Sequence, residues 1–168
     1  MAQLRQSLKN IRVADWMTES VLAVESFDSI AVARGLMAKH RINQLPVMDD
    51  GRLIGIVTDR DIRDAYPTSM MIDRAEAIDR FAEKITVEEV MTHDVFVVRP
   101  ETPLATAVNL LRRHRIGSLP VVKNGKLAGI ITRSDILDFV LSPTGKRARA
   151  TKQARARKPE PAKRRKSA

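Results

Sequence analysis

The chain has 168 residues, 43% of them hydrophobic, so it is long enough for one compact domain or two small ones with an apolar core. It contains no cysteine, which excludes disulfides and cysteine-ligated metal sites. The net charge of +10 comes from residues 143–168, which hold eleven basic residues and one acidic residue, whereas the rest of the chain carries 19 of each sign. Any binding to nucleic acid would therefore depend on this tail.

The N-terminal residues and the hydropathy pattern indicate where in the cell the protein is expected. Residues 1–12 mix polar and apolar side chains and lack the apolar stretch of a secretory signal. No apolar run approaches the about 20 residues that a membrane span needs. We therefore expect a cytoplasmic protein that has no membrane partner.

Three segments of the chain recur at one offset of 74 residues. They pair residues 13–18 with 87–92, residues 40–47 with 114–121, and residues 55–62 with 129–136. About 22 of 53 aligned positions are identical, which establishes an internal repeat. The pattern predicts an N-terminal segment (1–12), a first repeat (13–66), a connecting loop and helix (67–86), a second repeat (87–142) and a disordered basic tail (143–168).

Each repeat is predicted to begin with a short strand and a helix. The β-prone runs are residues 21–24 and 95–98. Apolar residues at helical spacing follow each run, and Asp28 and Thr102 are the expected N-caps of these helices, with Pro103 at the first helical position.

Two strands and a second helix are predicted to complete each repeat. Asn124-Gly125 is a strong signal for a two-residue hairpin, and Asp50-Gly51 is a weaker equivalent. The closing helices are expected to begin at Thr58 and Thr132. Since one repeat of this size would bury little core, we expect the two to pack together about a pseudo-two-fold axis.

In these motifs the chain resembles the CBS family, named for cystathionine β-synthase. The Met-Thr opening, the Arg-Ile-x-x-Leu-Pro-Val strand and the Gly-Ile-x-Thr-x-x-Asp ending each occur twice, over roughly residues 13–141. The segment that begins at Arg63 also resembles stand-alone CBS pairs related to acetoin-utilisation proteins, although those often carry an ACT-like domain where this chain has a basic tail. The resemblance implies an α/β (α+β) fold of tandem βαββα repeats, assembled as a homodimer.

The resemblance further implies a ligand and its contacts. CBS pairs commonly bind AMP, ADP, ATP or S-adenosylmethionine between the repeats, so we expect such a ligand and no required cofactor. The backbone of the first strand would contact adenine, and the Thr-x-x-Asp motif would face ribose and phosphate. Carried over by position, the adenine-side residues are Ser20, Val21 and Leu22 in one site and Asp94, Val95 and Phe96 in the other; the ribose and phosphate residues are Thr58 with Asp61 and Thr132 with Asp135.

General chemistry is compatible with these roles and also offers a simpler alternative. A carboxylate accepts hydrogen bonds from ribose hydroxyls, and a helix start suits a phosphate. Thr-x-x-Asp also matches a capping box, which would make it purely structural. The two sites differ next to the threonine, where Arg133 follows Thr132 but Asp59 follows Thr58. We therefore expect the better phosphate site at Thr132, Arg133 and Asp135.

Catalysis and metal binding are not expected. The chain has no Walker-type glycine loop, no nucleophile–base pair and no cluster of metal ligands, so neither catalytic nor metal-binding residues are assigned. His40 and His114 end equivalent helices, where the helix dipole favours a cation, and a capping role is the preferred interpretation. Trp16 is expected in the core or at an interface.

The leading functional hypothesis is a regulatory module that senses an adenine nucleotide and changes its shape or assembly on binding. The alternative is a non-specific nucleic-acid-binding protein in which the body dimerises two basic tails that contact DNA or RNA phosphates. A merely solvating tail is also possible. The residues that would contact a polyanion are Lys146, Arg147, Arg149, Lys152, Arg155, Arg157, Lys158, Lys163, Arg164, Arg165 and Lys166.

Overall fold

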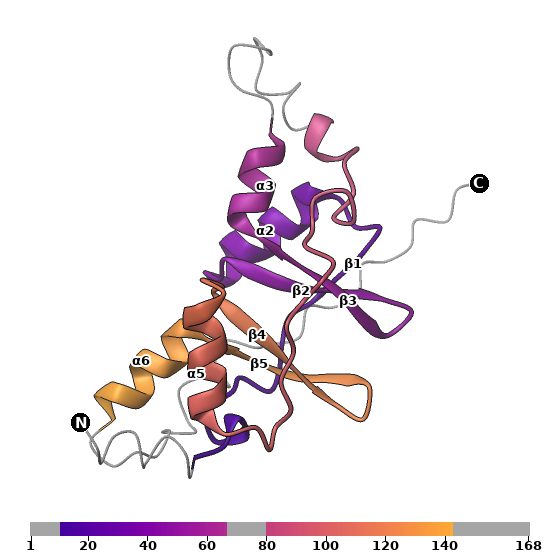
Figure 1. The fold of residues 1–168 in the computed structure, drawn as a ribbon. Helices are drawn as coiled ribbons and strands as arrows, with labels where there is room; N and C mark the ends of the chain where they lie inside the picture. Colours follow the sequence, from indigo (N-terminus) through magenta and orange to yellow (C-terminus); the bar gives the residue numbers. More distant parts are fainter. Residues whose placement is uncertain (1–10, 67–79, 143–168) are drawn as a thin grey trace.

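A computed structural model describes residues 11–66 and 80–142, which form two units of the same design (Figure 1). The predicted tail and residues 67–79 of the predicted connecting segment lie outside the described residues. The first sequence repeat contains the 3-10 helix η1 (Val13–Asp15), β1 (Val24–Glu25), α2 (Ile30–His40), β2 (Gln44–Asp49), β3 (Arg52–Thr58) and α3 (Asp59–Ala65). The second contains α5 (Leu104–Arg113), β4 (Ser118–Lys123), β5 (Lys126–Thr132) and α6 (Arg133–Leu141).

The two predicted hairpins are confirmed. β2 pairs with β3 and β4 pairs with β5, both antiparallel, and both ladders shift register at the same place, after Val47 and after Val121. The turn residues Asp50 and Gly51 have φ values of 46° and 74°, and their counterparts in the second hairpin have nearly the same values. Positive φ at both turn positions is what a type I′ hairpin requires. The two hairpins point the same way in Figure 1, and β3 contacts β5.

The first strand of each unit is shorter than predicted. Only Val24 and Glu25 form a strand, which pairs in parallel with β2, and residues 95–98 contribute a single parallel bridge between Val98 and Val121. The residues before Val24 and Val98 are β-prone, but propensity produces a strand only where a neighbouring strand is available. These segments meet the sheet only at their last residues.

The predicted N-caps of α2 and α5 are each wrong by one residue. Ser29 caps α2, and its hydroxyl accepts a hydrogen bond from Val32 N at 3.3 Å. Pro103 occupies the N-cap position of α5, without a side-chain cap. Asp28 and Thr102 instead accept hydrogen bonds from backbone N–H groups three residues earlier, at 2.9 and 3.0 Å, and so close the turns that precede the helices.

The opening segments of the two repeats are exchanged between the units. The backbones of Thr18 and Ile130 form two mutual hydrogen bonds, with N–O distances of 2.8 and 2.9 Å, and Thr92 forms the equivalent pair with Ile56. Trp16 consequently belongs to the core of the second unit, and Val87 to the core of the first. Each structural unit therefore combines most of one sequence repeat with the opening segment of the other.

Each unit is built around its own apolar core. The second core contains Trp16, which is 2% exposed and meets Phe139 edge-on with 5.2 Å between ring centroids. Trp16 is thus a core residue, as predicted. Within the described ranges, no helix is long and apolar enough to cross a bilayer.

Candidate functional site

A cavity of about 460 Å³ lies between the two units. Its volume falls in the range of small-molecule sites, about 300–1,000 Å³. The first repeat contributes Thr18, Ser20, Val21, Leu22, His40, Arg41, Ile42, Asn43 and Gln44, and the second contributes Gly117, Ile130, Thr132, Arg133, Ser134 and Asp138. A ligand in this space would contact both repeats at once.

The cavity unites two sets of predicted site residues that are distant in sequence. Ser20, Val21 and Leu22 line it together with Thr132 and Arg133. The exchange of opening segments explains this pairing, because the bonds between Thr18 and Ile130 place the residues after Thr18 beside the end of β5. The predicted adenine-side residues of one repeat therefore share a cavity with the predicted phosphate-side residues of the other.

The Thr-x-x-Asp motifs form capping boxes, as the simpler alternative predicts. Thr132 N and Thr132 Oγ1 both donate to Asp135 Oδ2, at 2.8 and 2.7 Å, while Asp135 N donates to Thr132 Oγ1 at 3.3 Å. Asp135 is only 1% exposed, and the acidic residue among those that line the cavity is Asp138, one turn later. Thr58 and Asp61 form the same box at the start of α3.

Two arginines and a histidine give the cavity its polar character. Arg41 follows α2 in the left-handed conformation, with φ of 53°, and Arg133 begins α6 and donates from Nε to Ile116 O at 3.0 Å. His40 is the last residue of α2, consistent with its predicted position at the helix end. Its Nε2 is buried and has no hydrogen-bond partner among the described residues, although the side chain lines the cavity.

Several residues of the cavity were not assigned from the sequence. The sequence predicts only a helix-end position for His40 and a place in the strand motif for Arg41. Asn43, Gln44 and Asp138 carried no assignment. The repeat is the sequence signal that points to two of these residues, because Arg41 and Asp138 have the counterparts Arg115 and Asp64 at the common offset of 74 residues.

The counterpart residues in the other half occupy the pseudo-symmetric position. Thr92 bonds to Ile56, which brings the segment containing Asp94, Val95 and Phe96 towards the end of β3, where Thr58 and Asp61 lie. The Phe96 ring lies against the His114 ring, with centroids 4.0 Å apart and a 31° tilt.

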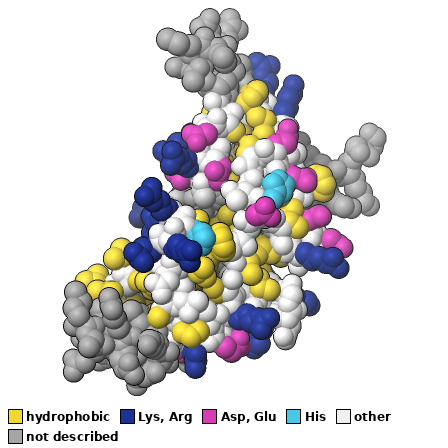
Figure 2. All heavy atoms as spheres, in the orientation of Figure 1, with side chains coloured by type: hydrophobic (Ala, Val, Ile, Leu, Met, Phe, Trp, Pro, Cys, Tyr) yellow, Lys and Arg dark blue, Asp and Glu magenta, His cyan; other side chains and the backbone are white. Residues whose placement is uncertain are grey.

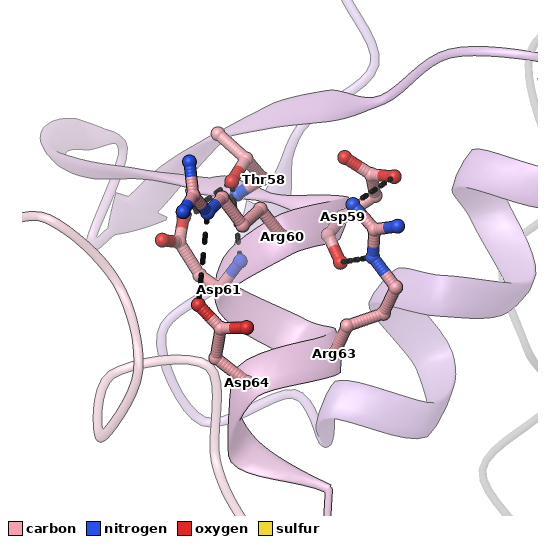
Figure 3. Close-up of polar contacts among 6 residues, drawn as sticks. All are labelled: Thr58, Asp59, Arg60, Asp61, Arg63 and Asp64. Carbon is pink, nitrogen blue, oxygen red and sulfur yellow. Dashed lines mark hydrogen bonds and ion pairs between the residues drawn. The ribbon is translucent and has the colours of Figure 1, made fainter.

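The start of α3 carries a local network of charges, shown in Figure 3. Asp59 and Arg63 form an ion pair at 3.3 Å, and Arg60 lies 3.8 Å from Asp64. Both pairs join residues four apart on the exposed side of the helix.

In the described part of the chain, no three His, Asp or Glu side chains are grouped to hold a metal ion.

Comparison with known proteins identifies the family. The CBS domain model matches residues 13–68 and again residues 87–142, which together make up most of the chain. The chain belongs to the CBS domain family. The predicted fold class, a mixed α/β pair of CBS repeats, is likewise confirmed.

Curated CBS relatives differ in how much of their length this chain spans. A CBS domain-containing protein of Dictyostelium discoideum is 34% identical over 136 residues, which are 78% of this chain and 92% of that protein. Inosine-5'-monophosphate dehydrogenase of Staphylococcus epidermidis is 39% identical over 113 residues, which are 65% of this chain. This match covers only 20% of the dehydrogenase, so the likeness concerns the CBS part of the present chain and a fifth of the enzyme.

Solved CBS structures superpose well on this fold. A Vibrio cholerae protein assigned to acetoin utilization (AcuB) has a TM-score of 0.65 at 32% identity, over 77% of this chain and 90% of its own, which confirms the predicted likeness to acetoin-utilisation proteins. The CBS domain pair of protein MJ0100, solved with 5'-methylthioadenosine and S-adenosyl-L-methionine, has a TM-score of 0.64 at 28% identity, over 77% and 95%. CBSX2 in complex with AMP has a TM-score of 0.63 at 30% identity, over 77% and 96%.

The predicted polyanion contacts all lie in residues 143–168, outside the described residues. Figure 2 shows basic and acidic side chains interspersed over the visible face of the body, in keeping with its balanced charge. The comparisons lend no support to nucleic-acid binding, which remains a prediction from the sequence of the tail.

Proposed function

We propose that this CBS pair is a regulatory module that binds AMP, ADP, ATP or S-adenosylmethionine in the cavity between its units. The observation that carries the proposal is that one cavity unites Leu22 of the first repeat with Thr132 and Arg133 of the second. Because both units would contact the ligand, occupancy would change their relative position or their assembly. This coupling makes the cavity a sensor and requires no catalytic group.

The adenine would lie beside the segment that precedes β1. None of the described residues forms a hydrogen bond with the backbone N–H or C=O of Leu22, so both groups are available to an adenine edge. Val21 and Leu22 supply apolar contact for the ring. A planar base that also forms hydrogen bonds at its edge suits this combination.

The phosphate would lie at the start of α6. This end of the helix has a partial positive charge, and Arg133 and Arg41 add two cations. Thr132 is held in position by Asp135 through the capping box, and Asp135 belongs to the proposed site in this way. Asp138 lines the cavity and is a second acceptor for ribose hydroxyls. AMP in complex with CBSX2 supports this class of ligand.

Titration calorimetry of the full chain with each of the four ligands tests the proposal. The Arg133→Ala variant should bind AMP about 10- to 100-fold more weakly, the scale of a lost charge-assisted hydrogen bond. Arg52→Ala is the matched control, because it removes the same charge from the exposed start of β3, outside the cavity lining. If none of the four ligands binds the unaltered chain, the proposed function is wrong.

We also propose that the module forms a homodimer through α6. Leu137, Val140 and Leu141 recur at helical spacing on this helix and are 62%, 57% and 78% exposed. Contiguous exposed apolar side chains on a soluble domain commonly mark an interaction site. A second copy that packs against this face would bury them.

A further inference from the structure

The two pseudo-symmetric helix starts present the same backbone geometry. Arg133 N donates to Gly117 O at 3.1 Å, and its counterpart Asp59 N donates to Asn43 O at 2.9 Å. The capping boxes at Thr132 and Thr58 also match bond for bond, with distances that agree within 0.1 Å. Any difference in ligand preference between the two positions must therefore come from side chains.

The charge at the first helical position is reversed between the two halves. Arg133 lines the cavity, whereas Asp59 occupies the equivalent place on α3. Arg63 is the ion-pair partner of Asp59 and is engaged with it twice, through the ion pair at 3.3 Å and from Nε to Asp59 O at 3.2 Å (Figure 3). A phosphate at this position would face the carboxylate of Asp59, whose ion-pair partner Arg63 is already engaged.

The difference extends to the base-side segment. Ser20 lines the cavity, and its counterpart at the other position is Asp94, a second negative charge. Leu22 and His40 also line the cavity, and their counterparts are Phe96 and His114, whose ring centroids lie 4.0 Å apart at a 31° tilt. The ring pair lies in the segment that corresponds to the adenine side of the cavity, where Leu22 has a smaller side chain.

From these differences we infer that each chain binds a single anionic nucleotide, in the cavity at Thr132 and Arg133. Asp59 and Phe96 exclude a second nucleotide from the pseudo-symmetric position, the first by charge and the second by filling space. The inference rests on the proposed function and adds the stoichiometry and the two residues that determine it. The sequence predicts two sites, of which the one at Thr132, Arg133 and Asp135 is the better phosphate site.

The test measures the number of AMP molecules bound per chain by calorimetry and equilibrium dialysis, on the full-length protein. The unaltered chain should bind one AMP, and Arg133→Asp should lose it. The double variant Asp59→Arg/Phe96→Leu copies the charge and size of the cavity residues and should bind two. Both side chains are substantially exposed, with 49% for Asp59 and 45% for Phe96, so the substitutions are compatible with folding, which circular dichroism would verify.

Different outcomes separate the inference from the proposed function. Two AMP molecules on the unaltered chain, or one that is retained by Arg133→Asp, would overturn the inference while the module remained a nucleotide-binding protein. A folded double variant that still binds one AMP would overturn the roles of Asp59 and Phe96. An unaltered chain that binds no adenosyl ligand would overturn the proposed function and the inference together.

Discussion

Thr18 and Ile130 are joined by two backbone hydrogen bonds, although they belong to different sequence repeats. The pair connects the Met-Thr opening of one repeat with the Gly-Ile-x-Thr ending of the other. It inserts the side chains before Thr18 into the second core and places the residues after it beside Thr132 and Arg133. One contact thus links the stability of the second unit to the formation of the cavity.

A methyl group at Gly129 should disturb this contact. A Cβ atom there would lie 2.8 Å from Thr18 O and 2.9 Å from Met17 Sδ, closer than such atoms approach. We expect Gly129→Ala to lower the free energy of unfolding by about 1–3 kcal/mol, the usual cost of overpacking, and to weaken AMP binding. Urea denaturation measures the first effect and calorimetry the second.

Gly35→Ala is the matched control for that substitution. Gly35 lies within α2, and a Cβ atom there would meet nothing within 4 Å. The change should stabilise the protein by about 0.5–1 kcal/mol, because glycine is unfavourable inside a helix. Equal effects of the two alanines would contradict the close approach of Thr18 to Gly129.

Truncation of Trp16 should destabilise the second unit more than the first. Trp16 is buried there against Phe139, although it precedes the first hairpin in sequence. We expect Trp16→Ala to cost about 3–5 kcal/mol. Amide hydrogen exchange should accelerate in α6 more than in α2, and the reverse order would argue against the exchanged packing.

Substitutions at Asp135 and Arg133 should distinguish effects on the stability of the fold from effects on AMP binding. Asp135→Ala removes a buried cap and should lower the free energy of unfolding by about 0.5–2 kcal/mol. It should also weaken AMP binding, because Thr132 loses its support. Arg133→Ala removes an exposed side chain, so thermal unfolding without ligand should change little while AMP affinity falls. If both variants unfold alike, Arg133 has a structural role.

A charge on the α6 face should dissociate the proposed homodimer. Leu137→Asp places a carboxylate among exposed apolar side chains, where a dimer would bury it without a partner. Light scattering at tens of micromolar should report a dimer for the unaltered chain and a monomer for the variant. Phe27→Asp is the control, because Phe27 is 74% exposed but precedes α2. A monomeric unaltered chain, with and without AMP, would refute the proposal.

Removal of residues 143–168 should leave AMP binding unchanged, because the cavity-lining residues that the structure describes all precede the tail. If the tail also binds nucleic acid, the full chain should bind DNA at about 50 mM salt, with a log–log salt slope of about −0.9 per phosphate contact. The shortened chain should not. Equal DNA binding by both chains would show that the tail is not responsible.

The local structure followed closely from the sequence. Asp50-Gly51 and Asn124-Gly125 predicted both hairpins, because few residues adopt positive φ at two successive positions. Cap positions were less accurate, since Asp28 and Ser29 can both accept a backbone hydrogen bond and the sequence does not show which of them the helix uses.

The sequence by itself determined the repeat, the order of its elements, its family and the chemical types of the site residues. Only the tertiary structure decided which of these residues share a cavity. Val13 and Val87 begin corresponding segments of the repeat, so local pattern favours neither core for either of them, and Ser20 has no sequence relationship to Thr132. The choice depends on long-range contacts, namely the approach of Thr18 to Gly129 and of Thr92 to Gly55, where the absence of a Cβ atom lets two backbones form hydrogen bonds.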